Sequence, residues 1–197
     1  MNDKQVHELL LQSLEHERGG IQVYETAVQC AARDDLRDEW KQYLKQTRDH
    51  ERILLKVCST IGLDPETETP GRAVVRALGQ SLVEAMEQAL ETGEPPAAQL
   101  VACECVVLAE TKDHLDWTLI GKCAEAIAGR VGAALKAAYD EVEDQEDEHL
   151  YHTKGWCREL WIESLGIAAV LPPPEEVRKV KTAMGAARAE QEAELSR

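Results

Sequence analysis

Phenylalanine is absent from this chain of 197 residues, and four tryptophans and four tyrosines supply all of its aromatic side chains. No apolar run approaches the roughly 20 residues that a membrane-spanning helix needs, and the N-terminal residues lack the apolar core of a signal peptide. The six cysteines include no Cys-x-x-Cys spacing, which argues against a zinc ribbon or a rubredoxin-type iron site. These absences predict a cytoplasmic protein without a membrane segment, in which the cysteines are reduced.

Positive charge is also scarce. The chain has 22 lysines and arginines against 37 aspartates and glutamates, so its formal net charge is −15. Such a surface repels phosphate backbones, and no basic patch with interleaved aromatic residues is visible, so nucleic-acid binding is not expected. Most of the acids are predicted to lie on solvated helix faces. Any carboxylate that points inward instead would require compensation, for which a metal ion is the simplest source.

Helix-forming residues dominate the sequence, and the two-residue alternation of strands is hard to find. Breaks rich in Gly, Pro and Asp delimit predicted helices over residues 4–32, 36–61, 72–91, 97–126 and 133–164, with a charged helix from residue 175 onward. The order indicates an all-α four-helix bundle: two helical hairpins joined by a long crossover that carries its own helix. Residues 1–170 form this bundle, and residues 171–197 form a Pro-rich break followed by a C-terminal helical tail.

Each of the four long helices places polar side chains in the middle of its apolar stripe. These residues are Glu17, His50, Glu110, Glu146 and His149. Glu17 and His50 lie at nearly equal distances along the chain from the first predicted turn, and Glu110 and His149 at nearly equal distances from the second. Antiparallel helices therefore bring them to one depth. Several buried carboxylates repel one another, and a cation removes that cost, so the pattern predicts a metal site.

The two hairpins also resemble each other in register, which indicates an internal duplication with pseudo-two-fold symmetry around the site. An offset of 93 relates Glu17 to Glu110, Tyr24 to Trp117 and Cys30 to Cys123. An offset of 99 relates Gln46 to Gln145, His50 to His149 and Cys58 to Cys157. The cysteines are accordingly interpreted as core positions.

This pattern resembles the ferritin-like di-iron family, which includes rubrerythrins, bacterioferritins and ferritins. That family carries Glu on the first helix, Glu-x-x-His on the second, Glu on the third and Glu-x-x-His on the fourth. Glu146 and His149 match the fourth-helix motif in full. The second-helix motif keeps His50 but has Thr47 where glutamate is expected. The resemblance covers residues 4–164.

The resemblance implies a ferritin-like bundle that holds two iron ions, or one, with manganese as another candidate metal. It implies an oxidoreductase of the ferroxidase or peroxidase type, which oxidises Fe(II) or another reductant with oxygen or peroxide. The implied metal ligands are Glu17, His50, Glu110, Glu146 and His149, with Asp113 and His114 as additions that compensate for Thr47. The electron donor is not indicated.

Two alternatives stay open because Thr47 removes a carboxylate. One is a non-enzymatic bundle with vestigial ligands that acts through association, and the other is a mononuclear metal-binding or sensing protein. His152 is predicted to lie beside the site or at the surface, and His7 and His16 to be exposed. The tail is predicted to pack across the bundle or onto a second subunit in a homodimer.

Overall fold

The computed structural model describes residues 2–91 and 93–197, and this part of the chain is helical with no strand. The helices are α1 (Asp3–Cys30), α2 (Asp34–Ile61), α3 (Pro70–Glu91), α4 (Pro95–Ala126), α5 (Gly129–Ser164), α6 (Pro174–Arg178) and α7 (Ala183–Leu195). The all-α prediction is confirmed. None of these helices is long and apolar enough to cross a membrane, as far as the described residues extend.

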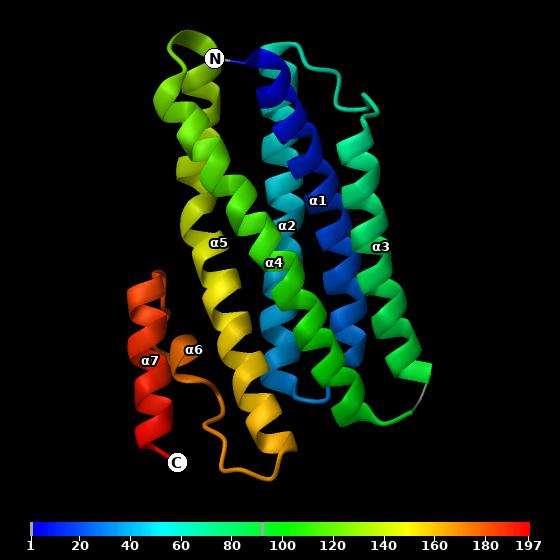
Figure 1. The fold of residues 1–197 in the computed structure, drawn as a ribbon, viewed down its shortest axis with the longest axis vertical. Helices are drawn as coiled ribbons and strands as arrows, with labels where there is room; N and C mark the ends of the chain where they lie inside the picture. The colour runs from blue at the N-terminus through cyan, green and yellow to red at the C-terminus, as the bar shows by residue number, and fades with distance from the viewer. Residues whose placement is uncertain (1, 92) are drawn as a thin grey trace.

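The long helices pack as a bundle of two antiparallel hairpins (Figure 1). Helices α1 and α2 form one hairpin, and α4 and α5 form the other. Helix α1 packs against α4, and α2 packs against α5. Helix α3 runs along the outside of α1 and α4 and carries the chain from the first hairpin to the second. The arrangement brings the middle of all four bundle helices together.

Two local devices set the turns at the ends of the hairpins. The Gln99 side chain on α4 accepts hydrogen bonds from the backbone N–H groups of Ala32 and Arg33, at 2.9 and 2.8 Å, and so ties the α1–α2 turn to the other hairpin. Helix α5 begins four residues earlier than predicted. Gly132 belongs to its first turn. Glycine is required there, because a Cβ at this position would lie only 1.7 Å from the Ile127 carbonyl oxygen.

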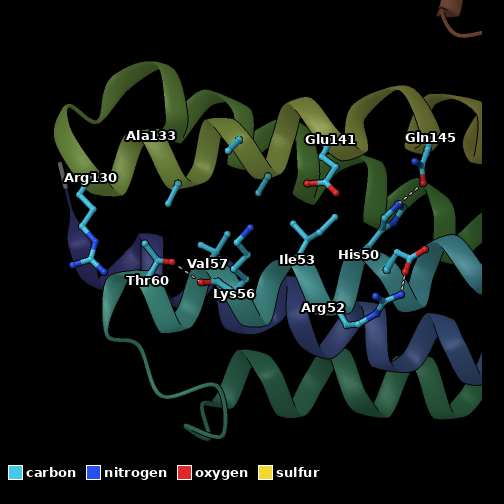
Figure 2. Close-up of a pocket in the computed structure, with 14 residues that line it drawn as sticks. His50, Arg52, Ile53, Lys56, Val57, Thr60, Arg130, Ala133, Glu141 and Gln145 are labelled. Carbon is cyan, nitrogen blue, oxygen red and sulfur yellow. Dashed lines mark hydrogen bonds and ion pairs between the residues drawn. The ribbon is translucent and has the colours of Figure 1, made fainter.

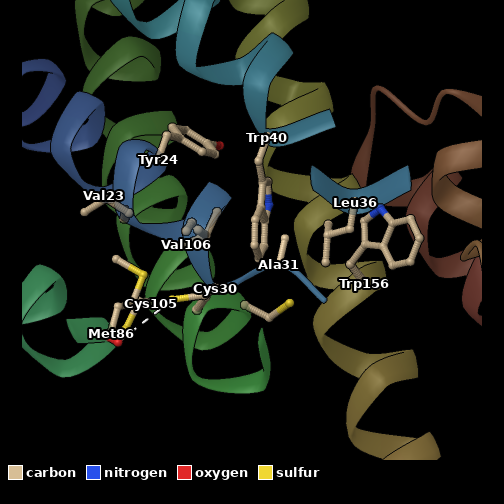
Figure 3. Close-up of a cluster of buried hydrophobic side chains, with 14 of the residues drawn as sticks. Val23, Tyr24, Cys30, Ala31, Leu36, Trp40, Met86, Cys105, Val106 and Trp156 are labelled. Atoms are coloured by element: carbon tan, nitrogen blue, oxygen red, sulfur yellow. Dashed lines mark hydrogen bonds between the residues drawn. The ribbon is translucent and has the colours of Figure 1, made fainter. Parts of the chain in front are cut away.

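The apolar core is divided into two clusters along the bundle. The cluster nearer the α1–α2 turn includes Tyr24, Trp40, Tyr43, Val106 and Trp156, together with Cys30, Cys103 and Cys105 (Figure 3). The cluster at the other end includes Leu10, Leu14, Leu54, Trp117, Leu135 and Val142. On each bundle helix, the predicted metal-binding residues lie in the interval between these clusters. All six cysteines are free, and four of them are buried.

Helix α3 gives α1 a second buried face. Arg72 on α3 is 1% exposed and binds Glu15 at 2.6 Å, and Arg76 binds the same carboxylate. The prediction that His16 is exposed is wrong: this residue is half-buried, and its Nε2 lies 3.0 Å from the Ala109 carbonyl oxygen. A single-stripe interpretation of α1 missed this contact because it did not allow for α4 covering a second face of the helix. His7 is exposed as predicted.

The C-terminal tail differs from the single helix expected there. Lys179 adopts a left-handed conformation with φ +50°, which ends α6, and Thr182 caps the separate helix α7. Both helices pack against α5 of the same chain. Arg158 on α5 holds the 2% exposed Glu175 of α6 through two contacts of 2.5 and 3.0 Å. The homodimer and the domain boundary at residue 170 stay predictions.

Replacement of Arg158 by Leu should destabilise the protein by about 3 kcal/mol, because it leaves the buried Glu175 carboxylate without its cation. The matched control is Arg178→Leu, which removes an exposed pair with Glu192 and should cost less than about 1 kcal/mol. Urea unfolding followed by circular dichroism measures both values. Equal losses in the two variants would show that the Arg158–Glu175 pair does not anchor the tail.

Candidate metal centre

Five of the predicted ligands meet at one depth in the bundle. Glu17 on α1, His50 on α2, Glu110 on α4 and the pair Glu146 and His149 on α5 are all at most 3% exposed. They form two triads, each consisting of one histidine and two glutamates, and Glu146 belongs to both. The five side chains thus surround two adjacent positions that share one carboxylate.

The distances within the triads are those of atoms that can share an ion. His50 Nδ1 lies 3.0 Å from Glu146 Oε1 and 3.8 Å from Glu17 Oε1. His149 Nδ1 lies 3.5 Å from Glu110 Oε2 and 3.6 Å from Glu146 Oε1. Two ligand atoms bound to one ion at about 2.1 Å are separated by about 3.0–3.4 Å in octahedral or tetrahedral geometry. Small side-chain shifts therefore suffice to bind an ion in each triad.

The imidazoles are oriented by glutamines from the opposite hairpin. His50 Nε2 lies 3.0 Å from Gln145 Oε1, and His149 Nε2 lies 3.0 Å from Gln46 Oε1. Because an amide oxygen only accepts hydrogen bonds, each Nε2 carries a proton, and each Nδ1 faces the centre as the ring atom that would bind an ion. The internal repeat relates these two hydrogen bonds to each other, because it relates His50 to His149 and Gln46 to Gln145.

The outer carboxylates are held in the same reciprocal way. The Tyr24 hydroxyl donates to Glu110 Oε1 at 2.7 Å, and Trp117 Nε1 donates to Glu17 Oε1 at 2.8 Å. Each aromatic residue thus supports the glutamate of the other hairpin. Sequence comparison related these residues as repeat partners but did not assign them this role, which depends on contacts across the bundle.

The symmetry fails at Thr47. Its hydroxyl donates to the Tyr43 carbonyl oxygen on its own helix, and its methyl group faces Gly20, where an added Cβ would lie 3.2 Å away. The repeat relates Thr47 to Glu146 and Gly20 to Asp113. One half of the centre therefore has a threonine and a glycine at the positions where the other half has two carboxylates.

Asp113 is 4% exposed, and its Oδ1 has no hydrogen-bond partner among the described residues. Burial raises its pKa well above the usual range, and the nearby charges of Glu146, Glu17 and Glu110 raise it further. Asp113 therefore restores the number of buried carboxylates in the centre to four. His114 points elsewhere: its side chain is 27% exposed, and Nε2 lies 2.7 Å from Asp147 Oδ1.

The centre contains more acceptor atoms than donors. In the described structure, hydrogen-bond partners are missing for Glu17 Oε2, His50 Nδ1, Glu110 Oε2, Asp113 Oδ1 and both carboxylate oxygens of Glu146. Unpaired buried polar atoms are costly, and native proteins contain few of them. Their concentration in the two triads and beside them is the fit expected of a cation site.

The pKa values of the central carboxylates shift in different directions. Burial raises the pKa of Glu146 to about 8, with the charge of Glu110 adding to the shift, and burial also raises the pKa of Glu17 well above its usual value. For Glu110, burial acts in the same direction, but the charge and hydrogen bonds of His149 and the Tyr24 hydroxyl outweigh it and lower the pKa. Burial thus favours the protonated forms of Glu17, Asp113 and Glu146 when no cation is bound, and a metal ion would displace such protons.

An open groove between α2 and α5 leads to the centre (Figure 2). It has a volume of about 700 Å³ and reaches from Arg130 and Thr60 at one end to His50 and Gln145 at the other. Its walls include small or apolar side chains: Ile53, Val57, Ala133, Ala134, Ala137 and Ala138. The groove ends against His50 and Gln145, at the outer edge of the centre.

The structure also contains a group of ionisable residues outside the centre that the sequence analysis did not predict. Glu39, His152 and Glu176 lie together beyond Tyr43, and His152 is 5% exposed. In the sequence, Glu39, Tyr43, Thr47 and His50 follow one face of α2, a signal that could have indicated Glu39. Nothing in the sequence indicated Glu176, because it lies in the tail.

Comparison of the chain with models of protein families, with curated proteins and with solved structures found no match. The functional interpretation therefore depends on the site itself.

In the metal-free protein, Glu146 should make the free energy of unfolding fall as the pH rises from about 5 to 8. Its pKa is about 8 in the folded chain against an ordinary value of 4.5, so within this window only the folded state retains the proton. Glu146→Gln should flatten the profile by up to about 1.4 kcal/mol per pH unit. Urea unfolding of both chelator-treated proteins across the window measures the difference, and parallel profiles would contradict the assignment.

Proposed function

We propose that this chain is a ferritin-like dinuclear metal protein that holds two iron ions, with manganese as the alternative metal. It oxidises Fe(II) or another reductant with oxygen or peroxide. The observation that carries the proposal is the membership of Glu146 in both triads, since this arrangement puts one carboxylate between two ion positions. The reciprocal support from the two hairpins favours a pair of ions over a single one.

The charge of the centre supports two divalent ions. Its four buried carboxylates, Glu17, Glu110, Asp113 and Glu146, carry four negative charges when deprotonated. With neutral imidazoles, two divalent cations balance that charge, whereas one cation leaves half of it uncompensated. Arginine and lysine provide no alternative, because no ion pair among the described residues joins these carboxylates to either.

The ligand types support iron or manganese. Carboxylates are hard ligands that can bridge two ions, and imidazole is suitable for iron as a terminal ligand. The same combination underlies the resemblance to the ferritin-like di-iron family. A pair of iron ions in such a site supplies the exchange of electrons with oxygen or peroxide.

The chain itself positions the ligands and controls access. Tyr24 and Trp117 hold Glu110 and Glu17 in place, while the free oxygens of Glu146 can shift between the two positions. The two apolar clusters exclude water along the bundle axis. His50 is the triad residue that lines the groove, so oxygen, peroxide and small reductants would approach the centre from the His50 edge.

Thr47 favours a second candidate function, a mononuclear or vestigial site in a protein that acts through sensing or association. Its hydroxyl is committed to the Tyr43 carbonyl oxygen, so it offers no anionic ligand to the ion beside His50. In this alternative, the chain binds one ion in the triad of Glu110, Glu146 and His149.

Protein from iron-replete cells should contain at least two transition-metal ions per chain, and Glu146→Gln should reduce this by at least one, because both triads lose their shared ligand. Asp140→Asn is the matched control: it removes a carboxylate from the exposed face of the same helix, where it pairs with Lys136, and should leave the content unchanged. Elemental analysis measures both variants. A single ion in the wild type would support the mononuclear alternative, and identical losses in the two variants would refute the site.

Of the two ions, the one beside His50 should be lost first on mild chelation, because Thr47 supplies no charge there. Thr47→Glu should tighten this ion about 10-fold or more and raise the rate of Fe(II) oxidation, because it restores a carboxylate at the position that the repeat relates to Glu146. Thr47→Gln matches its size without the charge and should produce neither effect. If Thr47→Glu binds less metal while Thr47→Gln folds normally, the dinuclear proposal fails.

A further inference from the structure

A second group of metal-binding side chains lies at the junction of three helices. Glu39 comes from α2, His152 from α5 and Glu176 from α6, and one ligand atom of each lies within 4.8 Å of the others. His152 Nδ1 is 3.6 Å from Glu39 Oε1 and 3.5 Å from Glu176 Oε2. These separations are close to the roughly 3.4 Å expected between atoms that share one tetrahedral ion.

The group is buried and incompletely satisfied. The side chains of Glu39 and His152 are 8% and 6% exposed, and Glu39 Oε1 and His152 Nε2 have no hydrogen-bond partner in the described structure. Trp156 Nε1 donates to Glu39 Oε2 at 2.6 Å and approaches Glu176 Oε2 at 3.3 Å. No described lysine or arginine forms an ion pair with either carboxylate, so two acids share one imidazole.

We propose that Glu39, His152 and Glu176 form a separate site for one divalent transition-metal ion, which joins the C-terminal tail to the bundle. One imidazole and two carboxylates are a donor set suitable for Zn²⁺, Mn²⁺ or Fe²⁺. A divalent ion with a neutral imidazole cancels the two negative charges, whereas a proton on His152 cancels only one. The site does not depend on the function proposed for the central pair.

The surroundings supply access and further ligands. A pocket of about 270 Å³ opens onto the group, and it is lined in addition by Asp35, Asp38, Gln42, Tyr43, Glu148 and Lys179. Water from this pocket can complete the coordination of an ion. The Tyr43 hydroxyl, now 2.9 Å from His152 Nδ1, is also within reach of Glu39 and can donate to that carboxylate once an ion occupies Nδ1.

The position of Tyr43 places this site next to the central one. Its ring centroid lies 4.1 Å from that of His149, while its hydroxyl contacts His152. An ion at the second site would therefore be separated from the central pair by a single aromatic side chain. Because Glu176 lies in α6, that ion would also hold the tail against the seam between α2 and α5.

The test is the binding of Co²⁺ to the full-length, chelator-treated chain, measured by equilibrium dialysis and by visible absorption. Glu176→Gln should lower the stoichiometry by one ion per chain, both in the wild type and in Glu146→Gln, where the central site is impaired. Glu39→Gln should do the same. Glu148→Gln is the matched control, since it removes a carboxylate from the same pocket without touching the triad, and it should retain the ion.

A second readout follows the tail. With free Co²⁺ at about 100 times the dissociation constant, opening of α6 should be suppressed about 100-fold, so limited proteolysis between residues 165 and 182 should slow accordingly. Glu176→Gln should abolish this protection. Unchanged stoichiometry in Glu176→Gln, or loss of the ion in Glu148→Gln as well, would overturn the second site. Loss of an ion in Glu176→Gln but none in Glu146→Gln would instead refute the central pair alone.

Discussion

Buried negative charge without a basic partner is the constraint on which this structure depends. Elsewhere in the chain, two buried glutamates are paired with arginine: Glu15 with Arg72, and Glu175 with Arg158. Glu17, Glu110, Asp113 and Glu146 have no such partner among the described residues. The three glutamates face imidazoles and neutral donors instead. Arginine compensates the buried charge at Glu15 and Glu175. At the centre, where no arginine is paired, a bound cation would do so.

The internal repeat explains how so many polar groups are accommodated. Each hairpin supplies the residues that orient the ligands of the other, through Gln46 and Gln145 and through Tyr24 and Trp117. Neither hairpin could therefore form an ordered half-site alone. Thr47 makes the two halves of the centre unequal in charge. The α1–α2 hairpin lacks a carboxylate at Thr47, and the α4–α5 hairpin has an additional one at Asp113.

The seam between α2 and α5 connects the features on either side of the centre. At one end it opens as the groove that reaches His50. At the other end, α6 lies against it and brings Glu176 next to Glu39 and His152. Tyr43 lies between this cluster and His149, so the tail and the centre are linked through one side chain.

The sequence by itself determined the five long helices, the shared depth of Glu17, His50, Glu110, Glu146 and His149, and their repeat partners. These features follow from helical periodicity and from distances along the chain. Only the tertiary structure decided which neighbouring residues face the centre. Asp113 and His114 are adjacent in sequence, yet one is buried beside Glu146 and the other pairs with Asp147 near the surface. The contact of His16 with Ala109 of α4 and the meeting of Glu176 with His152 likewise required the packing of distant helices. Periodicity describes one helix and says nothing of what covers its other faces.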